Sequence, residues 1–152
     1  MFMLVRRCEM TRLFKEHLPA NTPGLAGRGT IPKGVAMLKL KRIYDGAEPS
    51  DGYRILVDRI WPRGMSKQKA GVDLWLKDIA PSDALRKWFA HDPERWMEFQ
   101  RRYRYELRKQ KALTNEVKEL EKKHRTVTLI YSARDERHNQ AVALRSYLKK
   151  RG

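Results

Sequence analysis

The stretch VTLIYSA, residues 127–133, determines the fold class of this chain. It is an apolar, β-branched run without the polar alternation of a strand that has one face in water. A continuous run of this kind predicts a buried strand in a parallel sheet. Ala141, Leu144 and Leu148 follow at the spacing of a helix. A strand, a polar loop and a helix in this order are typical of an α/β domain.

Two more strands are predicted upstream, at residues 38–43 and 53–57, joined by the turn-forming segment DGAEPSDG. Residues 72–80 are interpreted as a further short strand. Strands that alternate with helices predict a small layered domain with a mostly parallel central sheet flanked by helices.

Capping residues mark the starts of the predicted helices. Ser66 precedes a short helical turn, Ser82 precedes a longer helix, and Asp92 stands before a proline, as at many helix starts. The apolar positions expected to face the core are Leu85, Trp88 and Phe89, then Trp96, Phe99, Tyr103 and Leu107, then Val117 and Leu120.

The composition is that of a globular protein with 152 residues, of which 34% are charged and 41% hydrophobic. The sole cysteine, Cys8, excludes an internal disulfide and fits a reducing cytoplasm. No apolar run has the length of a membrane span or the form of a signal peptide, so a soluble, cytoplasmic protein without membrane partners is expected. The oligomeric state is left open.

Residues 1–36 differ from the rest, since PANTPGLAGRGTIPKG has no periodicity. We interpret them as a flexible N-terminal extension before a plausible start at Met37, with a single domain over residues 37–152. The net charge is +16, and residues 1–36 contain only six of the basic and two of the acidic residues. The excess therefore belongs mostly to the folded part, where it either attracts polyanions such as nucleic acid or serves only as a solvated surface.

Two loops form the candidate site, because ligands bind beyond the carboxyl ends of parallel strands. One is DRIWPRGMSK, residues 58–67, and the other is SARDERHN, residues 132–139. Asp58 and His138 are the candidates for general acid–base catalysis. The candidate ligand-binding residues are Arg59, Arg63 and Arg134 as anion-binding forks, Trp61 for stacking, Gly64 for close backbone approach, and Asp135 and Asn139 beside His138.

Structural interpretations of the same residues stay open. Asp58 is explained equally well as the partner of an arginine, Asp135 as the cap of the last helix, and the tryptophans as core residues. No Walker loop, GxGxxG, HExxH, zinc-type spacing or GxSxG is present, so no cofactor and no metal are predicted. Ser132 is a weak candidate for a nucleophile.

Long segments of the chain resemble the DUF488 family, in particular its YeaO-like branch. They are KRIYD, DGYRILVDRIWPRGMSK, LWLKDIAPSDALRKWFAHDPERWMEF and VTLIYSARDERHNQAVAL. The resemblance runs from about Met37 to the C-terminus and implies a small α/β domain of uncharacterised function. Other branches carry a cysteine at the end of the last strand and a Cys-His-Arg segment at the next helix. This chain has Tyr131 and Asn139-Gln-Ala at those places, so cysteine chemistry is not expected.

Three functions remain. The first is binding of a small phosphate- or carboxylate-bearing ligand between the two loops, with enzymatic activity left open. The alternative is a nucleic-acid-binding or regulatory protein that uses its positive charge. The third is a structural or interaction role. A MarR-type regulator, a label that some family members carry, is disfavoured because YRILVDRI and VTLIYSA are strand runs.

Overall fold

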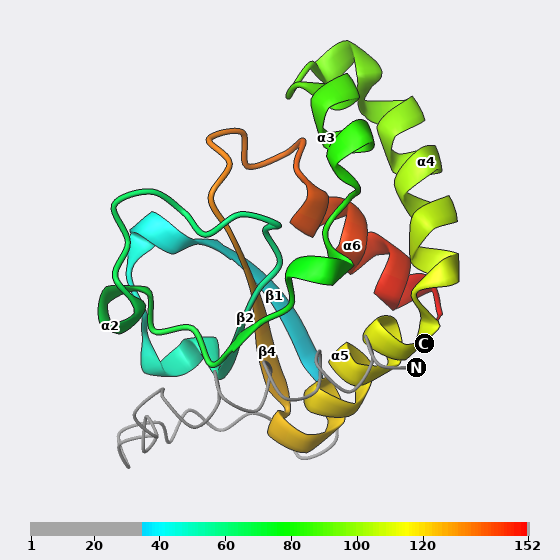
Figure 1. Cartoon of the computed structure of the whole chain (residues 1–152). Coiled ribbons are helices and arrows are strands. Elements are labelled where there is room, and N and C mark those ends of the chain that lie inside the picture. The colour runs from blue at the N-terminus through cyan, green and yellow to red at the C-terminus, as the bar shows by residue number, and fades with distance from the viewer. Residues whose placement is uncertain (1–34, 152) are drawn as a thin grey trace, which may run out of the picture.

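The computed structural model describes residues 35–151. In this part of the chain four strands form one sheet in the order β1-β4-β2-β3, and each neighbouring pair is parallel (Figure 1). The predicted α/β class with a parallel central sheet is therefore confirmed. The strands are β1 (Met37–Arg42), β2 (Tyr53–Leu56), β3 (Leu74–Trp75) and β4 (Thr126–Tyr131).

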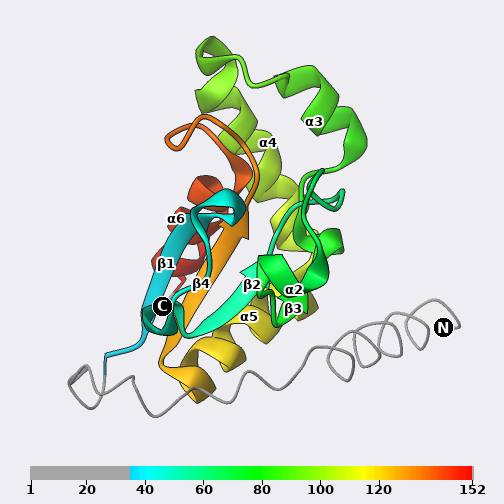
Figure 2. The ribbon, with the colours of Figure 1, turned by 90° about the vertical axis from the view of Figure 1, so that its left-hand side faces the viewer.

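The two faces of the sheet are covered unequally. One large core cluster joins the apolar residues of helices α3 to α6 to the strands, so these helices share one face. Figure 2, seen from the side of α2, has α4, α5 and α6 behind the strands. The opposite face is covered by α2 and by Trp61 and Met65 of the loop at residues 58–67. The helices are α2 (Lys67–Ala70), α3 (Asp83–Phe89), α4 (Trp96–Lys109), α5 (Lys111–His124) and α6 (Gln140–Lys150).

Strand β4 lies between β1 and β2, and this position explains its apolar sequence. Val127, Leu129 and Tyr131 pack into the large cluster under the helices. Ile130 points the other way, into the smaller cluster with Ala70. All six residues of β4 are buried, as the prediction of a strand covered on both faces requires.

The structure contains all the predicted strands, but several of them end earlier than the sequence predicted. β4 stops at Tyr131, short of residue 133, because the Ser132 N–H donates to the side chain of Asp58 at 3.0 Å and not to a neighbouring strand. β2 ends at Leu56, one residue early. The strand predicted over residues 72–80 shrinks to Leu74–Trp75, because a 3₁₀ turn occupies Lys77–Ile79.

Arg54 shows how a charged residue is accommodated inside β2. It is only 2% exposed. Its Nη1 pairs with the buried carboxylate of Asp51, and its Nε and Nη2 donate to the carbonyls of Gly71 and Ala70, each at 3.0 Å. A buried charge is tolerated when its hydrogen bonds are satisfied in this way. Through these bonds Arg54 links the C-terminal end of α2 to strand β2.

The predicted helix caps are confirmed. Ser66 and Ser82 each accept a hydrogen bond from the backbone N–H three residues ahead, at 3.1 and 3.2 Å. Asp92 caps a 3₁₀ turn, Pro93–Arg95, which leads directly into α4. The four tryptophans are each half-buried against the core clusters, consistent with a mainly structural role.

The expectation for residues 1–36 falls almost wholly outside the described residues, and only Val35 and Ala36 of that segment, both exposed, lie within them. Within residues 35–151, no helix combines the length and apolar character that crossing a membrane requires.

Candidate functional site

The two candidate loops lie at the same edge of the sheet. β2 and β4 are parallel neighbours, so the segments that follow them leave the sheet on the same side (Figure 1). Side chains join the loops directly, since Asp58 after β2 bonds to Ser132 after β4. The prediction that the loops share one edge is therefore confirmed.

Asp58 is the structural centre of this edge. It is 8% exposed. Oδ2 accepts hydrogen bonds from the backbone N–H of Ser132 at 3.0 Å and from its hydroxyl, and Oδ1 accepts one from Nε2 of Gln140. The backbone carbonyl of Asp58 also accepts from Nε1 of Trp75 at 2.8 Å. Among the described residues the hydrogen-bond partners of its carboxylate are therefore Ser132 and Gln140, and not the arginine that the sequence suggested.

Burial raises the pKa of Asp58 above its ordinary value of 3.8, against the opposing effect of the hydrogen bonds from Ser132 and Gln140. The folded state then binds more protons than the unfolded state above that value. The contribution of Asp58 to the free energy of unfolding therefore decreases as the pH rises from 3.8 to the folded-state pKa and is constant above it.

An Asp58→Asn variant lacks this titration. We expect the stability of the native protein relative to the variant to be greatest at low pH and to decline as the pH rises through that window. Urea unfolding of both proteins at a series of pH values measures the difference. A difference that grew with pH would mean that the carboxylate, and not the carboxylic acid, is the form favoured by the fold.

Arg59 contacts the segment that precedes α3. Its Nε donates to the carbonyl of Pro81 at 2.9 Å and its Nη2 to the carbonyl of Ala80 at 3.2 Å. It therefore fixes the segment that enters α3. Of the two arginines in the loop at residues 58–67, only Arg63 is exposed, and it makes no side-chain hydrogen bond or ion pair within the described residues.

Trp61 and Gly64 stabilise the loop at residues 58–67, and Trp61 packs on the face of the sheet that α2 covers. The indole Nε1 of Trp61 donates to the carbonyl of Met65 at 2.7 Å, and its ring packs edge-on against Trp75 at 5.4 Å. Gly64 has a φ of 75° in open space, so the turn requires glycine for its backbone and not for close contact. These contacts give both residues a structural role; the ligand-binding role stays a prediction.

A bridge from the end of β1 connects the two loops. Arg42 donates from Nε to the carbonyl of Ala133 at 3.0 Å, beside the exposed Arg134. The hydroxyl of Tyr44 donates to the carbonyl of Arg63 at 3.1 Å, and the Arg42 guanidinium lies 5.4 Å from the Tyr44 ring. Arg42 and Tyr44 were missed in the sequence; the signal for them is that β1 ends at the same edge as its parallel neighbour β4.

The second loop is held by its own side chains. Asp135 accepts hydrogen bonds from the N–H groups of Arg137 and His138 at 2.8 and 3.0 Å, and its Oδ2 lies 2.8 Å from Nδ1 of His138. The backbone hydrogen bond from Arg137, followed by the one from the His138 side chain, lowers the pKa of Asp135. The His138 ring stands edge-on to Trp96 at 5.3 Å.

Asn139, and not Asp135, caps α6. Its Oδ1 accepts from the N–H of Val142 at 3.1 Å, and its Nδ2 donates to the Asp135 carbonyl at 2.9 Å. The interpretation of Asp135 as the helix cap is wrong because Asp135 closes a turn four residues earlier. Asn139 is fully buried and therefore has a structural role in this position.

His91 has a small electrostatic influence that lowers the pKa of Asp58, which burial raises overall. Ala90 and His91 both have positive φ, 47° and 56°, an unusual conformation for residues with a side chain. Acidic groups are present here as well, since Asp45 and Glu136 act on the buried Tyr131, whose pKa is raised mainly by burial. No group of three or more His, Cys, Asp or Glu residues suited to a metal occurs within residues 35–151.

Comparison with known proteins gives a consistent result. The family model described as the inactive DUF488-N3 subclade matches residues 37–151. The uncharacterized protein YeaO of Escherichia coli is 41% identical over 112 residues, which cover 74% of this chain and 96% of YeaO. Uncharacterized proteins of Mycobacterium bovis and Mycobacterium tuberculosis are 49% identical over 76 residues, covering 50% of this chain and 64% of their own length. The match thus spans less than two thirds of the mycobacterial relatives. No solved structure matches.

Proposed function

Because this chain belongs to the DUF488 family, within the subclade described as inactive, we propose that it is a non-catalytic domain that binds a small anion. The ligand carries a phosphate or carboxylate and lies at the edge of the sheet formed by residues 58–67 and 132–139. The observation that carries this proposal is the bridge of Arg42 and Tyr44, which ties the backbone beside Arg134 to the backbone of Arg63.

The state of the two candidate catalytic residues supports a role without catalysis. Both carboxylate oxygens of Asp58 are already hydrogen-bonded, by Ser132 and Gln140. The Nδ1 of His138 is engaged by Asp135. Tyr131 stands at the position where other branches of the family have a cysteine, and it is only 4% exposed.

The anion preference rests on guanidinium groups from three segments. Arg63 and Arg134 are exposed, and Arg42 uses only its Nε, leaving its terminal nitrogens available in the described structure. Planar guanidinium groups bind phosphate and carboxylate through paired hydrogen bonds.

Replacing Arg63 with alanine should separate binding from stability. We expect the free energy of unfolding to change by no more than about 0.5 kcal/mol, as at ordinary surface positions. Loss of one charge-assisted contact should weaken binding of inorganic phosphate by about tenfold or more. Titration of the isotope-labelled protein with inorganic phosphate, followed by amide NMR shifts, measures the affinity.

Lys122→Ala provides the matched control, because Lys122 is an exposed cation on α5 and its removal changes the net charge equally. In the native protein the shifts should saturate and concentrate in residues 58–67 and 132–139. Shifts spread evenly over basic residues, or equal weakening by both substitutions, would show that phosphate is attracted only by the overall charge.

A further inference from the structure

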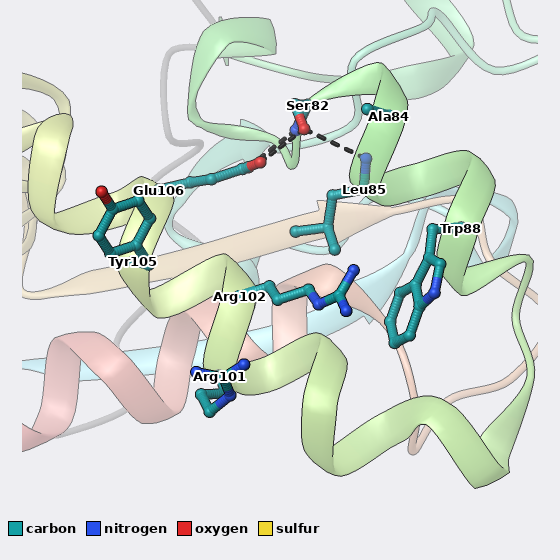
Figure 3. A pocket seen from close by; sticks show the side chains of 8 residues that line it. All are labelled: Ser82, Ala84, Leu85, Trp88, Arg101, Arg102, Tyr105 and Glu106. Atoms are coloured by element: carbon teal, nitrogen blue, oxygen red, sulfur yellow. Dashed lines mark hydrogen bonds between the residues drawn. The ribbon is translucent and has the colours of Figure 1, made fainter.

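A second surface, distinct from the strand edge, lies between α3 and α4. A half-open hollow of about 490 Å³ separates the two helices (Figure 3). This volume is in the range of small-ligand sites and suits one nucleotide. The lining residues are Ser82, Ala84, Leu85, Trp88, Arg101, Arg102, Tyr105 and Glu106.

Aromatic rings and cations alternate along this hollow. The Arg102 guanidinium lies 4.1 Å from the Trp88 ring centroid, and the Arg95 guanidinium lies 5.4 Å from it. Tyr105, on α4, is 59% exposed, and Nζ of Lys109 lies 4.4 Å from the centroid of its ring. An exposed tyrosine flanked by cations offers a face on which a base can stack and charges for the adjoining phosphates.

The acidic residues in the hollow are largely occupied. Glu106 accepts hydrogen bonds from the backbone N–H of Ser82 at 2.9 Å and from its hydroxyl at 2.5 Å. A single carboxylate, Glu98, serves both Arg101 and Arg102, at 2.7 and 2.8 Å. The side chains of these two arginines are 76% and 46% exposed. Exposed ion pairs are weak, so a phosphate can replace Glu98 as the partner of either arginine.

We propose that the hollow between α3 and α4 binds single-stranded nucleic acid, with one base stacked on Tyr105 and the neighbouring phosphates held by Arg101 and Lys109. Single strands are favoured over duplexes because the bases of a duplex have no free face for Tyr105. The net charge of +16 favours a polyanion over a neutral ring compound. This inference does not depend on the strand-edge site.

The test is fluorescence anisotropy with a labelled twelve-nucleotide oligo(dT), using the full chain. We expect saturable binding that weakens as salt rises. Tyr105→Ala and Arg101→Ser should each weaken it at least fivefold, whereas Tyr105→Phe, which keeps the ring, should bind like the native protein. Both native side chains are mostly exposed, so the variants should fold, and circular dichroism melts check this.

Lys122→Ser is the charge-matched control and should reduce affinity less than twofold. The proposal is overturned if Lys122→Ser and Arg101→Ser weaken binding equally, if a duplex of the same length binds as tightly and ignores Tyr105→Ala, or if a mononucleotide binds as tightly as the oligonucleotide. Arg63→Ala, which also removes one positive charge, should reduce oligonucleotide binding no more than Lys122→Ser does. If Arg63→Ala abolished oligonucleotide binding and Tyr105→Ala had no effect, the oligonucleotide would bind at the strand edge and the proposal for the hollow would be wrong. The phosphate titration would still test the strand-edge site separately.

Discussion

Gly52→Ala should destabilise the fold by about 4 kcal/mol or more, a large effect for a single methyl group. Gly52 has a φ of 65°, and a Cβ at this position would lie 2.2 Å from the carbonyl oxygen of Thr126 and 2.8 Å from its Cβ. Neither atom can move freely, because Thr126 begins the central strand β4. Chemical unfolding of the variant in urea measures the loss.

Gly46→Ala is the matched control. Gly46 also has a positive φ, 77°, but no atom lies within 4 Å of a Cβ placed there. The substitution should cost only the conformational strain of this backbone region, about 1–3 kcal/mol. Equal losses in the two variants would mean that the backbone conformation, and not the close approach of β2 and β4, sets the need for glycine at residue 52.

Patterns of apolar residues predicted the elements of this fold because burial acts on each element separately. β4 shows its position in the sheet through a run that is apolar on both faces. Ser66 and Ser82 show helix starts because a cap bonds only to its own first turn. Arg54 could not be predicted as buried, because its partners at Ala70 and Gly71 come from a helix end that only the folded chain brings near.

The shared edge of the two loops was predictable for a similar reason, since parallel strands release their carboxyl ends on one side. The direction of each side chain at this edge could not be predicted from the sequence. Arg59 donates to the carbonyls of Ala80 and Pro81, about twenty residues further along the chain, and no local sequence pattern predicts those acceptors. Likewise, the sequence suggested Asp135 as the cap of the last helix, whereas Asp135 closes a turn and Asn139 is the residue that caps α6.

Asp58→Ala should lower the free energy of unfolding by about 3 kcal/mol, because it leaves three partly buried donors without an acceptor. The affected donors are the N–H and hydroxyl of Ser132 and the amide of Gln140. These contacts join the ends of β2 and β4 to the start of α6, so hydrogen exchange should accelerate most in residues 132–139. Urea unfolding and amide exchange measure the two effects.

Asp58→Asn separates this structural role from a catalytic one. The asparagine oxygen can accept from Ser132, and its amide can donate to Gln140 once that side chain rotates, so the cost should stay within about 1 kcal/mol. A domain that only binds an anion should then keep its phosphate affinity within about twofold, whereas an enzyme with Asp58 as general base would fold normally and lose its turnover by a factor of about 100 or more. If Asp58→Asn were as unstable as Asp58→Ala, the buried charge itself would be required. That outcome would contradict the raised pKa of Asp58, because a fold that depends on the ionised carboxylate must lower that pKa.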